Sequence, residues 1–330
     1  MSLHITIRTD MGGEHGMGHA VRCLALAHAL NAQGAHVLFL TSTEGLENFV
    51  FPFTCLMIRN THGLDNELLQ LLATDVLIVD TKYPYTNDDF RSLEIPHIIR
   101  IDHPHAAGDS CDLLVVPNMH QEVSVEEQMR EQFGARLLYG PEYVMLSEEV
   151  LSEDVRPYVD REYGPIVFCA GGSDPNGCLQ KMHDWTEDFF LDNAMLMFAR
   201  GTYAPIVRSR HPRKTPTIQC VFSPSLMQKA SLVVGMFGVT PYEALRLQTP
   251  MLVMGHTEEN VIGADVLAQR TNGAVESLHH IDDMSPSLFQ ETLWRYWACL
   301  SQRKSMHRRA SKLIDGQGVT RITDAIMCMG

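Results

Sequence analysis

The sequence predicts an α/β protein with two parallel sheets, each flanked by helices. Apolar, strand-like runs alternate with helical patterns nearly from end to end, and 330 residues are enough for two ordinary cores. A glycine-rich loop also follows the first strand of each half. Since the carboxyl ends of parallel strands share one edge of a sheet, we expect ligand binding in a cleft where these loops converge.

The first half opens with alternating residues 4–7, which predict a strand. A glycine-rich loop follows, and residues 21–30 carry apolar side chains at helical spacing until Gly34. Further strands are predicted over residues 36–40, 76–79, 97–101 and 113–116.

A polar stretch over residues 147–163 separates the halves. We therefore expect a first domain over residues 1–155 and a second over residues 156–330, with the last helical segment able to pack back on the first. The second half begins with a predicted strand at 165–170 and a helix at 178–190. Its other strands are predicted over residues 194–198, 218–221, 231–234 and 251–254.

The composition indicates in which compartment the protein works and which classes of partner it disfavours. The formal net charge of −14 disfavours nucleic acid and anionic lipid, because like charges repel. Eight cysteines without any C-x-x-C pair indicate a reducing compartment. The opening residues lack a basic head and apolar stretch, and no run approaches the roughly 20 apolar residues of a membrane helix. We expect a cytoplasmic protein without membrane insertion, and its protein partners are left open.

Two motifs in the first half resemble a known family. Arg8 and Asp10 follow the first strand, and residues 16–23 form the pattern G-x-G-H-x-x-R-C. This is similar to the opening of the UDP-sugar hydrolases of pseudaminic acid biosynthesis, relatives of the glycosyltransferase-like proteins of spore coat polysaccharide biosynthesis. Similar segments follow at comparable spacing: CDLLVVPN, LLYGPEYVML, GGSDPNG, YEAL and DGQGVTRI.

The resemblance implies the GT-B fold, with two Rossmann-like domains and the nucleotide on the second. It implies hydrolysis of a UDP-linked diacetamido-trideoxy sugar, with His19 activating the water, and it implies no cofactor. Residues on the sugar side would be Arg8, Gly16, Gly18, Arg22, Asp80, Tyr83 and Asn118.

Chemistry favours His19 as a base. A nucleoside diphosphate is already a good leaving group, so one base could suffice, and a histidine suits that task near neutral pH. The alternative is that His19 only begins a helix. Asp10 would either orient the imidazole or cap the turn, and Arg22 would be a ligand contact or a solvated residue. His15 and His19 are four residues apart, but the glycines between them disfavour a helix there, so we predict no metal.

The sugar side departs from the family at residues 80–85. Asp80 matches the Asp-His-Tyr that is common there, whereas the histidine is absent, so Lys82 or Tyr83 would take over a sugar contact or the acceptor pocket is changed. Asn118 would contact an acetamido group or form a turn.

In the second half, amides of Gly171, Gly172 and Ser173 would bind the diphosphate at a helix N-terminus. The alternative is a turn with Ser173 or Asp174 as N-cap and Pro175 at the first helical position.

The second loop of this half has the spacing of a capping box at Thr240 and Glu243. The resemblance instead implies that the Glu243 carboxylate accepts hydrogen bonds from the ribose hydroxyls. Further candidates for the UDP site, by resemblance, are Gly238, Val239, Thr240, Glu259 and Asn260, the last two of which alternatively begin a helix.

Together these observations predict hydrolysis of a UDP-sugar in nonulosonic acid or related surface-polysaccharide biosynthesis. A glycosyltransferase with the same donor site, in which His19 deprotonates an alcohol, is the first alternative. A nucleotide-sugar-binding protein without turnover is the second.

Overall fold

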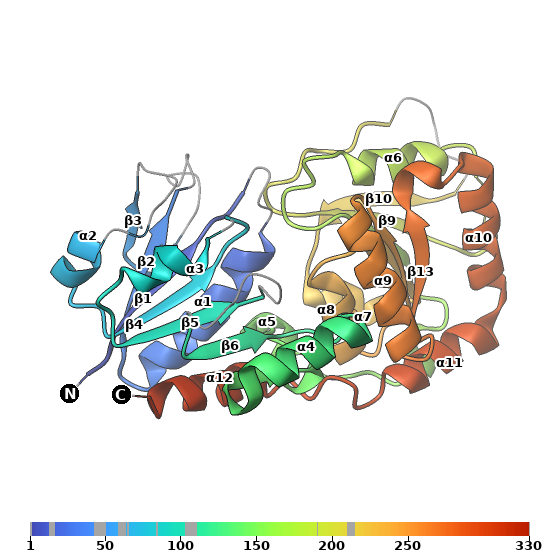
Figure 1. Ribbon diagram of the computed structural model, residues 1–330. Helices are drawn as coiled ribbons and strands as arrows, with labels where there is room; N and C mark the ends of the chain where they lie inside the picture. The colour runs from blue at the N-terminus through green and yellow to red at the C-terminus, as the bar shows by residue number, and fades with distance from the viewer. Residues whose placement is uncertain are drawn as a thin grey trace. The chain divides into compact units, whose positions relative to one another are not determined.

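The chain forms two compact units, which Figure 1 shows. Unit 1 comprises residues 1–147 and 316–330, and unit 2 comprises residues 148–315. The division lies earlier than residue 155, because helix α5 (Glu148–Leu151) contacts α7 (Pro224–Lys229). The computed structural model describes residues 2–12, 17–42, 51–58, 64, 66–83, 85–102, 111–189, 191–209 and 215–329.

Unit 1 is built on a parallel seven-stranded sheet with the strand order β3-β2-β1-β4-β5-β6-β7. The strands that sequence reasoning missed, β3 and β7, lie at its two edges. The strands are β1 (His4–Thr9), β2 (His36–Thr41), β3 (Cys55–Met57), β4 (Val76–Asp80), β5 (His97–Ile101), β6 (Leu113–Val116) and β7 (Leu137–Tyr139).

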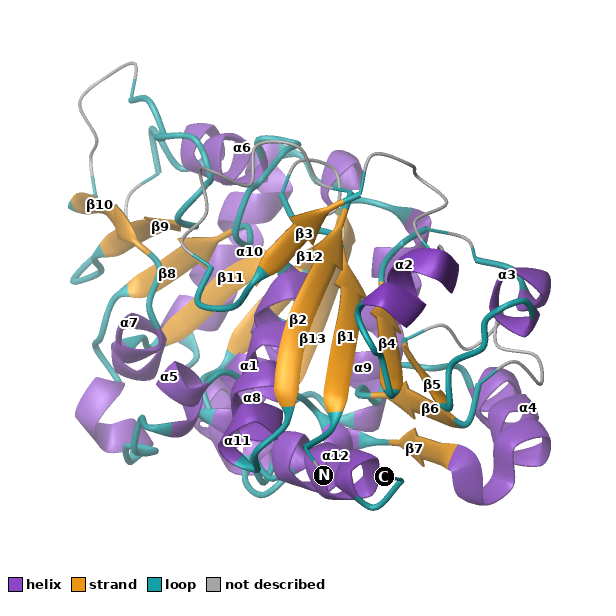
Figure 2. Cartoon of the chain, turned by 90° about the vertical axis from the view of Figure 1, so that its left-hand side faces the viewer, coloured by secondary structure: helices purple, strands orange, loops and turns teal. Residues whose placement is uncertain are grey.

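Helices cover both faces of this sheet (Figure 2), because successive side chains of a strand point to opposite faces. Strand residues such as Ile7 and Ile78 pack with α1 and α12, whereas Leu77 and Leu114 pack with α2, α3 and α4. The last helix therefore belongs to unit 1. The helices of this unit are α1 (Gly18–Ala32), α2 (Asn66–Leu71), α3 (Asn87–Arg91), α4 (Val123–Phe133) and α12 (Gly318–Met327).

Unit 2 has a six-stranded parallel sheet with the order β10-β9-β8-β11-β12-β13. Strand β13 at its edge was not predicted. The strands are β8 (Ile166–Cys169), β9 (Leu196–Arg200), β10 (Thr217–Val221), β11 (Leu232–Met236), β12 (Met251–Gly255) and β13 (Val275–His280).

The core of unit 2 joins Phe168, Phe198 and Leu252 of the sheet to α6 and α10. Helices α8 and α9 contact strands β11 to β13. Besides α5 and α7, the helices are α6 (Cys178–Trp185), α8 (Thr240–Arg246), α9 (Glu258–Arg270), α10 (Pro286–Ala298) and α11 (Leu300–Ala310).

The first residue of α12 fits closely against the chain that follows β7. A Cβ at Gly318 would lie 2.2 Å from the carbonyl oxygen of Val144. Because a backbone carbonyl cannot rotate away as a side chain can, we expect Gly318→Ala to lower the free energy of unfolding by about 1–3 kcal/mol. Urea denaturation measures this, with Gly238→Ala as the control, since nothing lies within 4 Å of a Cβ there. Equal stability of both variants would contradict this packing.

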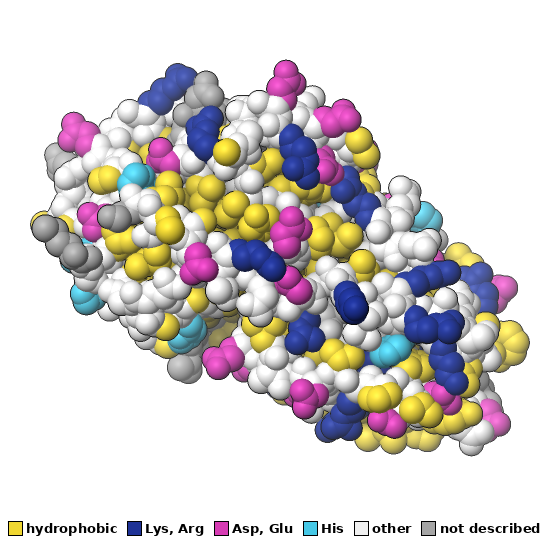
Figure 3. All heavy atoms as spheres, turned by 90° about the horizontal axis from the view of Figure 1, so that it is seen from below, with side chains coloured by type: hydrophobic (Ala, Val, Ile, Leu, Met, Phe, Trp, Pro, Cys, Tyr) yellow, Lys and Arg dark blue, Asp and Glu magenta, His cyan; other side chains and the backbone are white. Residues whose placement is uncertain are grey.

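Helix α11 carries a run of basic side chains although the chain is acidic overall. Arg303 is buried, and Lys304 pairs with Glu162. On the face seen from below, Lys and Arg lie among acidic and apolar side chains (Figure 3). No helix among the described ranges is both long and apolar enough to cross a bilayer.

Candidate active site

The carboxyl edge of the unit 1 sheet brings together the start of α1 and the ends of β4, β5 and β6. Strand β1 lies between β2 and β4, so the chain continues from β1 to one side and from β4 to the other. Ligands of open parallel sheets bind at such a point. The register pairs Thr9 with Asp80, which places the carboxylate that ends β4 beside the end of β1.

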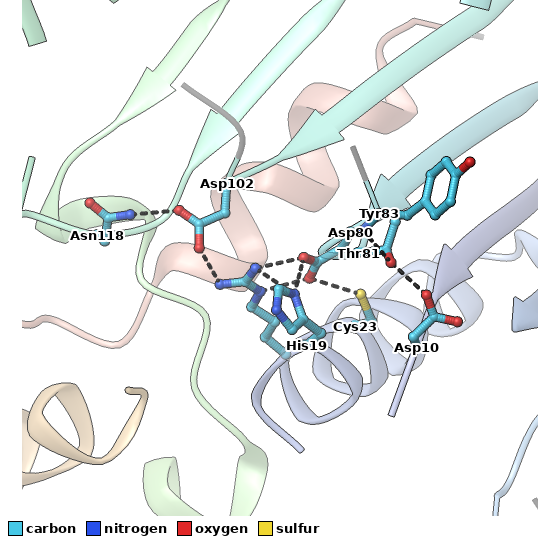
Figure 4. Close-up of polar contacts among 9 residues, drawn as sticks. Asp10, His19, Cys23, Asp80, Thr81, Tyr83, Asp102 and Asn118 are labelled. Atoms are coloured by element: carbon cyan, nitrogen blue, oxygen red, sulfur yellow. Dashed lines mark hydrogen bonds and ion pairs between the residues drawn. The ribbon is translucent and has the colours of Figure 1, made fainter. Parts of the chain in front are cut away.

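His19 lies in the first turn of α1 and contacts Asp80 (Figure 4). The distance from His19 Nδ1 to Asp80 Oδ1 is 2.6 Å. Asp80 is fully buried, whereas the His19 side chain is 17% exposed. Burial alone would raise the pKa of Asp80, but Arg22 and His19 hold it well below the usual range of a carboxyl. An ionised carboxylate accepts only, so the proton of the neutral imidazole is held on Nδ1 and the lone pair of Nε2 remains available.

Two more side chains of α1 converge on the same carboxylate. Arg22 donates from Nε to Asp80 Oδ2 and from Nη2 to Asp80 Oδ1, each at 2.6 Å. Cys23 donates from Sγ to Oδ2 at 3.3 Å. Burial and the neighbouring Asp80 raise the pKa of Cys23 well above its usual value, so it remains a thiol. Arg22 is therefore not the solvated residue of the alternative interpretation.

The network continues to the ends of β5 and β6. Arg22 Nη1 donates to Asp102 Oδ2 at 2.9 Å, and Asn118 Nδ2 donates to Asp102 Oδ1 at 2.9 Å. The amide oxygen of Asn118 in turn accepts from Gln121 at 3.2 Å. Asn118 is only 3% exposed, so these contacts rather than solvent occupy most of its amide.

Asp10 does not orient the imidazole in this structure, which corrects that expectation. Its carboxylate accepts from Arg8 at 2.6 Å, from the Thr81 hydroxyl at 2.5 Å and from the Ser42 amide at 2.9 Å. Arg8 is fully buried and also donates to the Tyr85 hydroxyl, so a sugar contact by Arg8 is not supported either. Asp10 and Arg8 brace the end of β1, while the start of α1 faces the end of β4.

Of the remaining expected residues of unit 1, the structure describes Gly18 and Tyr83. Gly18 is the first residue of α1, and Gly16 lies outside the described residues. The Tyr83 ring lies 4.5 Å from the Tyr85 ring between centroids, and in Figure 4 it points away from His19.

In unit 2, the loop after β8 runs close to the end of β9. Gly171 has a φ of +79°, which favours glycine. A Cβ at Gly201 would lie 2.3 Å from the carbonyl oxygens of Gly171 and Gly172. The close approach requires glycine at position 201, and Ser173, which follows the two glycines, is partly exposed.

Asp174 occupies the N-terminus of α6. Its carboxylate accepts from the amides of Cys178 at 2.8 Å and Leu179 at 3.0 Å, while burial raises its pKa against the effect of these bonds. The helix begins at Cys178, so Pro175 is not its first residue, contrary to the alternative interpretation. Because Asp174 accepts from two backbone amides of the first turn, these amides are not available to a diphosphate. The amides expected to bind a diphosphate are then those of the preceding loop, Gly171–Ser173.

The loop after β11 leads into α8, which begins at Thr240 with Val239 as N-cap. The capping box expected from Thr240 and Glu243 is absent because Val239 takes the cap position. Burial raises the pKa of Glu243 to about 7; the Thr240 hydroxyl opposes the shift and Glu149 adds to it. Gly238 is exposed, so packing does not require a glycine there.

Glu259 and Asn260 lie in the first turn of α9, as the alternative interpretation expected. The Thr257 hydroxyl caps this turn by accepting from the Asn260 amide at 3.2 Å. Glu259 is exposed.

The sequence did not predict that Asp80 is the shared partner of His19, Arg22 and Cys23. Sequence reasoning treated Asp80 as a sugar contact and assigned no role to Asp102 or Thr81. One signal was present: His19, Arg22 and Cys23 have the i, i+3, i+4 spacing of one helix face, which predicts a common partner.

The comparisons with known proteins agree with this architecture. No protein-family model matches the chain. The chain is 23% identical to the spore coat polysaccharide biosynthesis protein SpsG of Bacillus subtilis, over 97% of both chains. The crystal structure of MurG from Acinetobacter baumannii is similar with a TM-score of 0.65, at 14% identity over 99% of each chain.

A structure of the spinosyn rhamnosyltransferase SpnG with thymidine diphosphate is similar with a TM-score of 0.58, at 14% identity over 98% of this chain and 100% of that one. Together with the two parallel-sheet units, these likenesses confirm the GT-B fold.

Proposed function

We propose that the chain is a nucleotide-sugar enzyme of the glycosyltransferase type that acts in polysaccharide biosynthesis, with His19 as its general base. The observation that carries the proposal is the 2.6 Å contact between His19 and the buried Asp80 carboxylate. The likeness to SpsG supports the polysaccharide assignment. The fold shared with MurG and SpnG, the latter with thymidine diphosphate, supports a nucleotide-sugar donor.

The proposed reaction uses one base and no protein acid. His19 Nε2 takes the proton of a hydroxyl, the hydroxyl oxygen forms a bond to the anomeric carbon, and the bond from that carbon to the diphosphate breaks. A glycosidase needs a second carboxyl group to protonate its leaving oxygen, whereas a diphosphate leaves as a stabilised anion. The Asp80 carboxylate stabilises the imidazolium that forms.

We assign the sugar to unit 1 and the nucleotide, as UDP, to unit 2. Amides of Gly171, Gly172 and Ser173 would bind the diphosphate, with Thr240 as a further donor. Glu243 is partly exposed as a residue, and its carboxylate would accept from the vicinal ribose hydroxyls, since its two oxygens suit a diol. Secondary candidates are Gly238, Val239, Glu259 and Asn260.

Hydrolysis of a UDP-linked diacetamido sugar is the second candidate function. It is favoured by the G-x-G-H-x-x-R-C motif, whose histidine, arginine and cysteine all reach Asp80. Water would then replace the acceptor hydroxyl at the same base. The comparisons favour transfer, because the similar solved structures include glycosyltransferases.

UDP release from a panel of UDP-sugars separates these functions. Release that needs an added polysaccharide or sugar acceptor supports transfer, and release without acceptor supports hydrolysis. Heavy-oxygen water distinguishes the site of attack, because label in the sugar means attack at carbon and label in UDP means attack at phosphorus. Tight UDP-sugar binding without release under any condition would contradict both enzymatic functions.

Glu243 makes nucleotide affinity depend on pH. With a pKa of about 7, the Glu243 carboxyl is about half protonated at pH 7, and the protonated form must lose its proton before it can accept from both ribose hydroxyls. We expect the Kd for UDP to fall as pH rises from 6 to 8, by up to about tenfold per pH unit below the pKa, with proton release on binding. Calorimetry in buffers of different ionisation enthalpy measures this. The terminal phosphate of UDP titrates in the same range and adds a pH dependence of its own. Glu243→Gln should reduce the dependence to this contribution, and an unchanged dependence in that variant would exclude Glu243 as a source.

A further inference from the structure

We propose that Asp102 is a positioning residue for His19 that acts through Arg22 and Asp80. The proposal rests on the proposed role of His19 as the base. It extends the site from one histidine–carboxylate pair to a chain of contacts across three adjacent strand ends.

The contacts run without a break from β6 to the imidazole. Asn118 and Arg22 each donate to Asp102 at 2.9 Å, through different carboxylate oxygens. Arg22 then forks onto both oxygens of Asp80 at 2.6 Å, and Asp80 Oδ1 contacts His19 Nδ1. Because Nη1 of Arg22 is held by Asp102, the guanidinium cannot rotate away from the two oxygens of Asp80. Asp102 therefore fixes the plane in which Asp80 meets the imidazole.

Charge gives Asp102 a second effect. The Arg22 guanidinium lies 3.1 Å from His19 Nδ1, so it opposes a positive charge on the imidazole. Asp80, Asp102 and Arg22 together carry a formal charge of −1, and the cluster becomes neutral when His19 accepts a proton. Without the charge of Asp102, proton transfer would leave the cluster at +1. Among the residues that the structure describes, the other titratable groups that face the cluster are the Cys23 thiol, beside Asp80, and His120, which favours the ionised form of Asp102.

The backbone at Asp102 adopts an uncommon conformation that suits this role. Its φ is +59°, in the left-handed region that aspartate tolerates better than most residues. Its amide donates to Val115 at 2.8 Å, which ties the turn to β6. Asn118, buried beside it, then orients the carboxylate toward Arg22.

The test compares Asp102→Asn with Asp88→Asn, which breaks the exposed ion pair to Arg91 and serves as the matched control. We expect Asp102→Asn to lower kcat for UDP release about tenfold with KM nearly unchanged, as one lost charge acts through Arg22. The acid side of the kcat–pH profile should move to lower pH, because the protonated imidazole loses a favourable charge. Asn118→Ala should shift the profile in the same direction by less. A wild-type kcat and pH profile in Asp102→Asn would overturn the proposal.

Nitrogen NMR of the His19 ring provides a readout that does not need turnover. The wild-type spectrum should show the proton on Nδ1, and Asp102→Asn should shift or broaden this signal while Asp88→Asn leaves it unchanged. If no UDP-sugar is turned over by the wild type, the proposed function fails, and the ring signal alone tests the positioning. An unchanged signal in Asp102→Asn would then reject it.

Discussion

Replacement of His19 by alanine should reduce kcat for UDP release by about 100- to 10,000-fold, the usual contribution of a general base. The Kd for UDP should stay within about twofold, because we assign the nucleotide to unit 2 and His19 belongs to unit 1. Stopped or coupled assays of UDP release measure the rate, and calorimetry measures the affinity.

His28→Ala is the matched control for this prediction. His28 lies on the same helix and is exposed, so its removal tests for a general effect of losing a histidine from α1. His28→Ala should keep wild-type kcat. If His19→Ala also kept it, His19 would not be the base, and its contact with Asp80 would serve only the structure of α1.

Asp80→Asn should have a comparably large effect on the rate and a separate effect on stability. Asparagine keeps the shape of the side chain but can present an N–H to His19 Nδ1, which favours the wrong tautomer. We expect kcat to fall about 10³- to 10⁴-fold, as when the orienting carboxylate of a catalytic triad is replaced. Among the described residues, Arg22 would keep Asp102 as its one anionic partner, so the free energy of unfolding should fall by about 3 kcal/mol.

Cys23→Ala serves as the control for Asp80→Asn, because it removes a donor to the same carboxylate without touching His19 or Arg22. A thiol is a weak donor, so kcat should change by less than about threefold. An equal loss of activity in both variants would show that the rate depends on packing around Asp80 rather than on the effect of the Asp80 charge on the His19 imidazole.

The sequence predicted the strands at residues 97–101 and 113–116 with the bounds of β5 and β6, and it predicted the largely exposed edge strand β10 to within one residue. Residues 113–116 are a continuous apolar run, which is typical of a strand buried on both faces. Strands β3 and β7 have three residues each at the sheet edges, too short to show a period. The helix predicted over residues 178–190 ends at Trp185, since propensity does not fix where packing stops a helix.

The sequence singled out His19 as a base, which stays a prediction, but it did not predict the contact of His19 with Asp80. From the sequence, Asp10 was the candidate for orienting His19, with a turn cap as the equal alternative. The choice of Asp80 depends on the register of β1 with β4, which pairs Thr9 with Asp80 across some seventy residues. Such a long-range pairing leaves no local signal that identifies which carboxylate is the common partner of the α1 side chains.

The return of the chain to unit 1 after residue 315 has a consequence for synthesis on the ribosome. Ile322 and Ile326 of α12 are fully buried in the core that contains Ile7 and Leu26. Translation delivers all of unit 2 before these two isoleucines emerge. Unit 1 is thus begun first and completed last. The part of α1 that packs against α12 therefore stays uncovered in the nascent chain until α12 has been synthesised.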